Sequence, residues 1–125
     1  ETPVVIVNVT RSGPSTGIPT KSEQSDLNIA LYGCHGDAPH LVLAPLTISD
    51  AVFTTYWATC LAEKLQTVAI VLSDQFLGQS RAIINEPVFK KVNCKRLIMS
   101  LDKLKEKDYQ RYKSTDNSVS PMSIP

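Results

Sequence analysis

The sequence predicts an α/β fold in which a parallel sheet is flanked by helices. Three short runs of aliphatic and β-branched residues lack strict alternation of polar and apolar positions, which is typical of strands buried on both faces of a parallel sheet. The segments between these runs carry helix start signals and apolar residues at helical spacing. Strand, helix, strand, helix and strand therefore follow one another, which is the order of a parallel α/β sheet.

The three predicted strands are short and apolar. The first is Pro3–Val9, a nearly continuous β-branched run. The second is Leu41–Ala44, which Pro45 ends, and the third is Val68–Leu72. Because none of them alternates, we expect each strand to be buried on both faces.

The first predicted helix runs from about Lys21 to Tyr32. Thr20 and Glu23 match a capping box, in which the hydroxyl caps the helix and the acid three residues later reaches back. Gly33 is expected to end this helix.

The second predicted helix begins within Thr47–Asp50, with Ser49 as its cap, and ends near Gln66. We expect Tyr56 and Trp57 to lie in the core or in a subunit contact. The predicted apolar side of the helix comprises Phe53, Trp57, Cys60, Leu61 and Leu65.

The composition changes after Gly78. A basic stretch between Lys90 and Arg96 is expected to be solvated, Leu101–Tyr112 to form a short exposed helix, and Ser114–Pro125 to be an extended linker. We therefore divide the chain into residues 1–88, part of the α/β domain, and residues 89–125, a linker toward a following domain.

Composition and charge narrow the classes of partner. The chain has 125 residues, of which 42% are hydrophobic and 20% charged, and its net charge is +1. This is ordinary for one globular domain or less. The balanced charge provides no field for nucleic acid or an anionic membrane, and no apolar run approaches the roughly 20 residues that span a bilayer. We expect neither nucleic acid nor a membrane as a partner.

Three cysteines, Cys34, Cys60 and Cys94, are widely spaced and odd in number. This pattern argues against a disulfide scaffold, a zinc site or a cysteine-held iron–sulfur cluster within the chain. Isolated thiols are typical of a reducing compartment, so we expect a cytoplasmic protein.

The densest candidate site is the loop from Arg11 to Gly17, which follows the first predicted strand. Open α/β sheets bind ligands at the carboxyl ends of their strands. The loop combines two glycines, two hydroxyl residues (Ser15 and Thr16) and Arg11, whose planar fork suits a carboxylate or phosphate. An ordinary turn with a surface arginine is the alternative. The spacings of a Walker loop and of a Gly-x-Gly-x-x-Gly dinucleotide turn are absent.

Two further groups of polar residues have a functional and a structural interpretation. His35 and Asp37 could serve in acid–base chemistry or bind a metal, or could form a local turn. Asp74, at the end of the third predicted strand, could bind a cation or cap the next helix. We expect Cys34 to be a structural thiol.

The motifs in order resemble one known family. The segment Arg11–Lys21 contains Gly-Pro-Ser-Thr-Gly-x-Pro-Thr and is followed by Glu23-Gln24-x-Asp26-Leu27. It resembles the signature of the alpha subunit of 2-oxoacid:ferredoxin oxidoreductases, most closely those that use 2-oxoglutarate. The similarity continues through further matching segments almost to the end of the chain: His35–Asp37, Leu43–Pro45, Leu61–Glu63, Val71–Gln75 and Val119–Pro121.

The resemblance implies part of a thiamine-diphosphate-binding α/β domain that faces the aminopyrimidine of the cofactor. A beta subunit would hold the diphosphate, its Mg²⁺ and an iron–sulfur cluster. The implied reaction is the oxidative decarboxylation of a 2-oxoacid with coenzyme A, with electrons passing to ferredoxin. Arg11 matches the arginine that faces the substrate carboxylate, and Ser15 and Thr16 match the adjoining loop. These three are the expected substrate-binding residues.

Several features favour a fragment, or an inactive relative, over a complete enzyme. The chain lacks an initiator Met and its three strands form a thin core, so we expect a piece of a longer polypeptide with an unpaired sheet edge. No Tyr-Pro-Ile-Thr-Pro segment or activating Glu of the family is matched here, and Ser12 and His40 replace the usual Gly and Arg. The fragment alone is expected to be inactive, and a non-catalytic assembly or binding module is the alternative.

Overall fold

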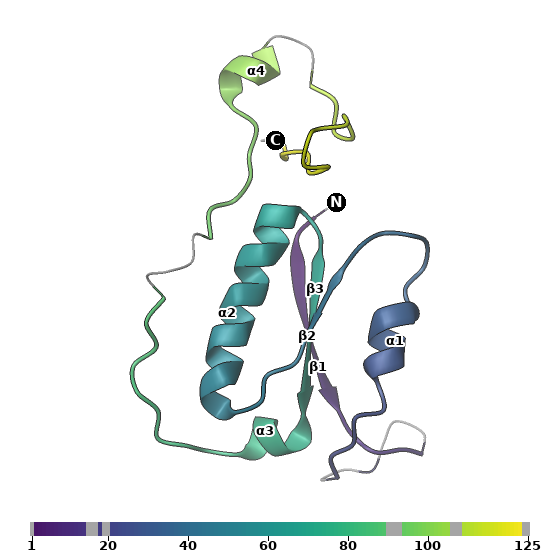
Figure 1. Ribbon diagram of the computed structural model, residues 1–125, viewed down its shortest axis with the longest axis vertical. Coiled ribbons are helices and arrows are strands. Elements are labelled where there is room, and N and C mark those ends of the chain that lie inside the picture. The colour runs from purple at the N-terminus through teal and green to yellow at the C-terminus, as the bar shows by residue number, and fades with distance from the viewer. Residues whose placement is uncertain (1, 15–17, 19–20, 90–93, 106–108, 124–125) are drawn as a thin grey trace.

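The computed structural model describes residues 2–14, 18, 21–89, 94–105 and 109–123. Its sheet has three parallel strands in the order β1-β3-β2. Helix α2 lies on one side of this sheet and α1 on the other (Figure 1). The predicted α/β class is therefore confirmed. The elements along the chain are β1 (Val4–Thr10), α1 (Leu27–Tyr32), β2 (Leu41–Leu43), α2 (Ile48–Leu65), β3 (Val68–Asp74), α3 (Gln75–Gln79) and α4 (Leu101–Lys105).

The core lies between α2 and the central strand β3. It is built from Ala58 and Ala62 of α2 and Ala69 and Val71 of β3, all at most 2% exposed. Small side chains let the helix approach the sheet closely, so the contact is dense although few large residues take part.

The burial expected for the first strand is wrong. Val4, Ile6, Val7 and Val9 of β1 are each about half exposed. The reason is that β1 lies at the edge of the sheet, pairing only with β3 among the described strands. The described helices cover little of either of its faces, although Val5 packs against the core.

Helix α1 is shorter than predicted. It begins at Leu27, and Asp26 occupies the position before it without a side-chain cap. Thr20 lies outside the described residues, and the Glu23 carboxylate accepts a hydrogen bond from the amide of Gly13 rather than capping a helix. The predicted stop at Gly33 is confirmed. A β-carbon there would lie 2.5 Å from the carbonyl oxygen of Ile29, so a side chain does not fit.

Helix α2 matches its predicted extent, but its predicted cap is wrong and its predicted apolar face is only partly confirmed. Thr47, not Ser49, is the cap. Of the predicted face, Cys60 is 3% exposed and Leu61 is half-buried, whereas Phe53, Trp57 and Leu65 are each about 40% exposed. The residues of α2 that pack against the sheet are Ala58 and Ala62. A row of large apolar residues at helical spacing predicts a buried face. Close packing of a helix on a sheet, however, favours small side chains on the helix.

We expect Thr47→Ala to lower the free energy of unfolding by about 1 kcal/mol, because the N-cap hydrogen bond is lost. The Thr47 hydroxyl accepts from the Asp50 amide at 3.1 Å, and the Asp50 carboxylate accepts from the Leu46 amide at 2.8 Å. Ser49→Ala, inside the helix, is the matched control and should change stability by less than about 0.5 kcal/mol. Urea unfolding of both variants provides the comparison. An equal loss in the two variants would contradict the assignment of the cap.

Cysteine pairing also differs from the prediction. Cys60 and Cys94 are joined as a disulfide, and Cys34 is a free, exposed thiol. A separation of 34 residues gives no local signal for pairing. The chain after α3 runs back past α2 (Figure 1), and the disulfide joins its Cys94 to Cys60 of that helix. The expectation of three isolated thiols is therefore wrong, and thiol usage no longer supports a cytoplasmic location.

The region after α3 is only partly helical. Helix α4 covers Leu101–Lys105 of the predicted Leu101–Tyr112, residues 106–108 lie outside the described part of the chain, and residues 111–112 form a turn. The segment near Met122 is not simply extended, because it folds back and forms a parallel bridge with Ile98. The proposed boundary at residue 88 remains a prediction.

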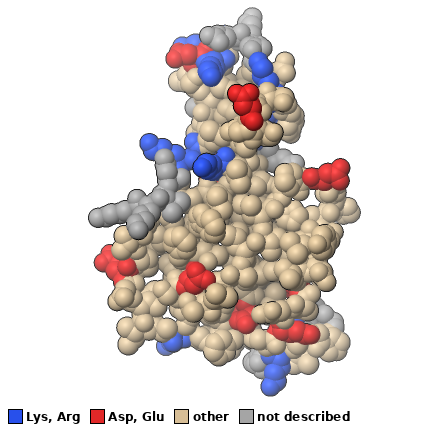
Figure 2. All heavy atoms as spheres, in the orientation of Figure 1, with Lys and Arg blue, Asp and Glu red and all other residues tan. Residues whose placement is uncertain are grey.

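The face of the molecule seen in Figure 2 is mixed in charge. Acidic and basic side chains are interspersed over the face in Figure 2 and do not gather there into one large patch. Among the described helices, none combines the length and the apolar character needed to cross a bilayer.

Candidate functional site

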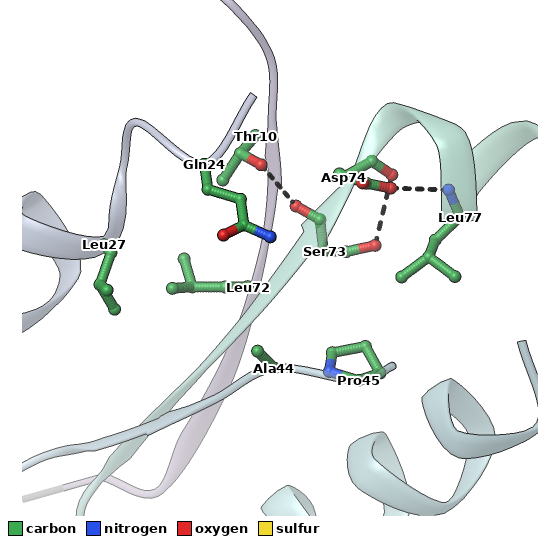
Figure 3. Close-up of a pocket in the computed structure, with 9 residues that line it drawn as sticks. All are labelled: Thr10, Gln24, Leu27, Ala44, Pro45, Leu72, Ser73, Asp74 and Leu77. Carbon is green, nitrogen blue, oxygen red and sulfur yellow. Dashed lines mark hydrogen bonds between the residues drawn. The ribbon is translucent and has the colours of Figure 1, made fainter. Parts of the chain in front are cut away.

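A cavity of about 150 Å³ lies at the carboxyl ends of the strands. Because all three strands are parallel, their ends meet at this edge, where open α/β sheets bind ligands. Figure 3 shows the side chain of Gln24 extending into the cavity from the loop before α1. The lining residues come from six segments of the chain: Thr10, Gln24, Leu27, Ala44, Pro45, Leu72, Ser73, Asp74 and Leu77.

Two polar side chains of this cavity hold its walls together. The hydroxyl of Thr10, which is 4% exposed, donates to the carbonyl of Ser73 at 3.0 Å and joins the ends of β1 and β3. The carboxylate of Asp74 accepts from the Leu77 amide at 2.7 Å and caps α3 (Figure 3). The capping interpretation of Asp74 is therefore confirmed. Gln24 is the polar lining residue whose side chain is best placed to meet a ligand.

The loop after β1 is closed on itself by backbone hydrogen bonds. The Ser12 amide donates to the Lys21 carbonyl at 3.1 Å, and the Ile18 amide donates to the Ser12 carbonyl at 2.5 Å. Glu23 adds a third tie by accepting from the Gly13 amide at 3.1 Å. These contacts hold the loop against the segment that precedes α1.

Ser12 itself fits its position without backbone strain. Among described residues other than glycine, positive φ values occur at Gln66 and Ser118 and not at Ser12. A β-carbon is therefore accommodated where the family usually has glycine. The Ser12 hydroxyl is buried and has no hydrogen-bond partner among the described residues.

Only one of the three predicted substrate-binding residues can be located. Arg11 is half-buried and is the next residue after Thr10, which lines the cavity. Its side chain is not among the groups that line the cavity. Ser15 and Thr16 lie outside the described residues.

The other sequence candidates lie elsewhere. His35 and Asp37 are exposed in the connection that leads into the amino end of β2, at the opposite edge of the sheet from the cavity. His40 is tied to the backbone, because its Nε2 contacts the Ala30 carbonyl at 2.7 Å. Within the described part of the chain, no three His, Cys, Asp or Glu residues are grouped as a metal site would require.

Sequence analysis did not identify Thr10, Gln24 or Leu27 as residues of this site. Thr10 lies just beyond the first predicted strand, and its hydroxyl joins the ends of β1 and β3. Gln24 and Leu27 were part of a family motif but had no assigned role. The motif was the one feature of the sequence that could have indicated these two residues. They come to lie beside Leu72 and Ser73 only because the chain folds back across the ends of the strands.

The comparisons with known proteins agree with this architecture. The family model "Pyruvate flavodoxin/ferredoxin oxidoreductase, thiamine diP-bdg" matches residues 1–123. The chain belongs to this family. The resemblance to alpha subunits of 2-oxoacid:ferredoxin oxidoreductases is thereby confirmed, and the family is one of thiamine-diphosphate-binding domains.

Individual relatives of this oxidoreductase family are similar along most of the chain. The 2-oxoglutarate synthase subunit KorA of Archaeoglobus fulgidus is 48% identical over 87 residues, which are 70% of this chain and 25% of the relative. Subunit alpha of 2-oxoacid:ferredoxin oxidoreductase 1 of Sulfurisphaera tokodaii is 37% identical over 127 residues, covering 99% of this chain and 20% of the relative.

A solved structure is also similar. It is the 2-oxoglutarate:ferredoxin oxidoreductase from Magnetococcus marinus with 2-oxoglutarate, coenzyme A and succinyl-CoA bound. The TM-score is 0.82 at 40% identity, covering 99% of this chain and 21% of that one. The chain thus spans a quarter or less of the length of these relatives.

The cavity at the carboxyl ends of the strands does not enclose a whole thiamine diphosphate. A cavity of about 150 Å³ is well below the roughly 300–1,000 Å³ of pockets that enclose organic ligands of that size. The carboxylate that lines the cavity, that of Asp74, already caps α3. This cavity of the oxidoreductase-family chain can therefore supply at most part of the wall of a site for that cofactor.

Proposed function

We propose that this chain is part of the alpha subunit of a 2-oxoacid:ferredoxin oxidoreductase, with 2-oxoglutarate as the substrate. The proposed reaction is a coenzyme A-acylating oxidative decarboxylation that uses thiamine diphosphate. The observation that carries the proposal is the family match over residues 1–123. The names of the relatives, 2-oxoglutarate synthase among them, favour 2-oxoglutarate within this class.

The proposal includes the partners that such a reaction needs. A beta subunit would share the thiamine diphosphate and hold its Mg²⁺ and an iron–sulfur cluster, while ferredoxin and coenzyme A act at the level of the complex. The relatives are named as subunits, which supports a multi-subunit assembly. The similar solved structure has coenzyme A bound, which supports coenzyme A as the acyl acceptor. A cytoplasmic location is part of the same proposal.

Substrate binding is assigned to Arg11, Ser15 and Thr16. Arg11 follows the strand whose last residue, Thr10, lines the cavity at the ligand-binding edge of the sheet. A 2-oxoacid carries a carboxylate, and a guanidinium can donate two parallel hydrogen bonds to it. Residues 1–88 would form part of the domain that faces the aminopyrimidine, and residues 89–125 would lead toward the next domain.

The test is an assay of the full-length subunit purified anaerobically with its beta partner. We expect reduction of ferredoxin, or of a viologen dye, that requires 2-oxoglutarate, coenzyme A and thiamine diphosphate together. We also expect kcat/KM for 2-oxoglutarate to exceed that for pyruvate at least about tenfold, the discrimination that a fitted pocket readily provides.

Each other outcome of this assay has a defined meaning. A preference for pyruvate would overturn the substrate while retaining the reaction class. A stable complex with the beta partner but no substrate-dependent reduction would overturn the catalytic proposal. It would favour a non-catalytic assembly module.

A further inference from the structure

One face of α2 is contacted by the chain that follows α3. Tyr56, Cys60 and Glu63 are spaced by four and three residues, so they share one face of the helix. Each meets one residue of the returning chain. These partners, Phe89, Cys94 and Arg96, are here called the strap.

The three contacts differ in kind. The rings of Tyr56 and Phe89 lie 4.4 Å apart between centroids, and the Tyr56 hydroxyl contacts the Phe89 carbonyl at 3.5 Å. Arg96 donates through Nη2 and Nε to the Glu63 carboxylate, the shortest distance being 2.9 Å. The disulfide between Cys60 and Cys94, whose Cα atoms lie 4.3 Å apart, stands between these two contacts.

The disulfide is the contact that decides whether the strap stays closed. The guanidinium side of the ion pair is 60% exposed, so water screens its attraction to the Glu63 carboxylate. The single contact between the rings of Tyr56 and Phe89 is also too weak to hold the strap by itself. The disulfide is covalent, so it holds Cys94 against α2 however weak the other two contacts are.

The sheet does not depend on the strap. The core residues Ala58, Ala62, Ala69 and Val71 pack between α2 and β3, and none of the strap residues belongs to this cluster. Opening of the disulfide would therefore release the strap and leave the α/β core folded. The two sulfurs also differ in access, because Cys60 is 3% exposed whereas Cys94 is partly exposed.

We propose that Cys60 and Cys94 form a redox-sensitive pair that fastens the strap to α2 when oxidised and releases it when reduced. The co-reactant is a dithiol/disulfide couple. One thiolate of the dithiol attacks the Cys94 sulfur, the bond between the cysteines breaks, and Cys60 leaves as a thiolate that takes a proton. The second thiol of the dithiol then displaces Cys94. In total, two electrons and two protons move to the cysteines, and the dithiol becomes a disulfide.

The experiment uses the full-length subunit with its partner, equilibrated anaerobically with reduced or oxidised dithiothreitol. Alkylation followed by mass spectrometry should label Cys60 and Cys94 in the reduced sample and neither of them in the oxidised one. Limited trypsin digestion should cut after Lys95 or Arg96 about tenfold faster in the reduced sample, because cleavage follows the population of the open segment. Cutting after Lys64, near the end of α2, should stay unchanged.

Two serine variants distinguish an effect of the Cys60–Cys94 disulfide from an effect of any other cysteine. Cys34→Ser removes the exposed free thiol and should keep the redox dependence of cleavage. Cys94→Ser should be cut rapidly under both conditions. Equal cleavage of the two wild-type samples, labelling of both cysteines after oxidation, or faster cutting at Lys64 on reduction would each overturn the proposal. None of these readouts requires oxidoreductase activity, so they test the strap independently of the proposed function.

Discussion

We expect Arg11→Ala, in the full-length subunit assembled with its beta partner, to lower kcat/KM for 2-oxoglutarate about 100-fold. The proposed role of Arg11 is a paired, charge-assisted hydrogen bond to a substrate carboxylate, and removal of such a bond typically costs about 1.5–3 kcal/mol. The loss should arise mainly as a higher KM, because the carboxylate is bound both before and during the reaction. Steady-state kinetics with a viologen dye provide the measurement.

Two further variants sharpen this result. Arg11→Lys keeps the charge but not the planar fork, so it should recover only part of the lost kcat/KM. Arg81→Ala, at an exposed position beyond α3, is the matched control and should leave the kinetics unchanged. Unaltered kinetics in Arg11→Ala would remove Arg11 from substrate binding while leaving the family assignment intact.

We expect Ala58→Leu to lower the free energy of unfolding by about 2 kcal/mol, because overfilling a packed core typically costs about 1–3 kcal/mol. Ala58 is 0% exposed and lies between α2 and β3, where Ala62, Ala69 and Val71 leave no room for three more carbon atoms. Urea unfolding followed by circular dichroism measures the change.

The matched control for this prediction is Thr55→Leu, which adds an apolar side chain at an exposed position of the same helix. It should change stability by less than about 0.5 kcal/mol. A loss as large in Thr55→Leu as in Ala58→Leu would show that the effect comes from the helix surface rather than from the contact with β3.

The sequence and the structure agree best where the information is local. Val68–Leu72 lies within β3, and the predicted stop at Gly33 ends α1, because residue preference and steric fit act over a few neighbouring residues. Prediction failed where two local solutions competed. Thr47 and Ser49 can both cap a helix, and the extended backbone at Thr47, with Asp50 reaching back to Leu46, selects the first.

The candidate site shows the same division. The sequence predicted a ligand-binding loop after the first strand, and the cavity does lie at the carboxyl ends of the strands. It did not predict that Gln24 would extend over the ends of β1 and β3, or that Thr10 would bond to Ser73. Those contacts join residues up to 63 positions apart, and no local preference encodes them.

Residue patterns alone established the α/β class, the three strands, the long helix and the family, because periodicity and ordered motifs are properties of the linear chain. Folding in three dimensions was needed to show which face of α2 meets the sheet, that β1 lies at an edge, and that Cys60 meets Cys94. The physical reason is that burial and pairing depend on how closely distant segments approach. The small side chains of Ala58 and Ala62 permit an approach to β3 that Phe53 and Trp57 would block.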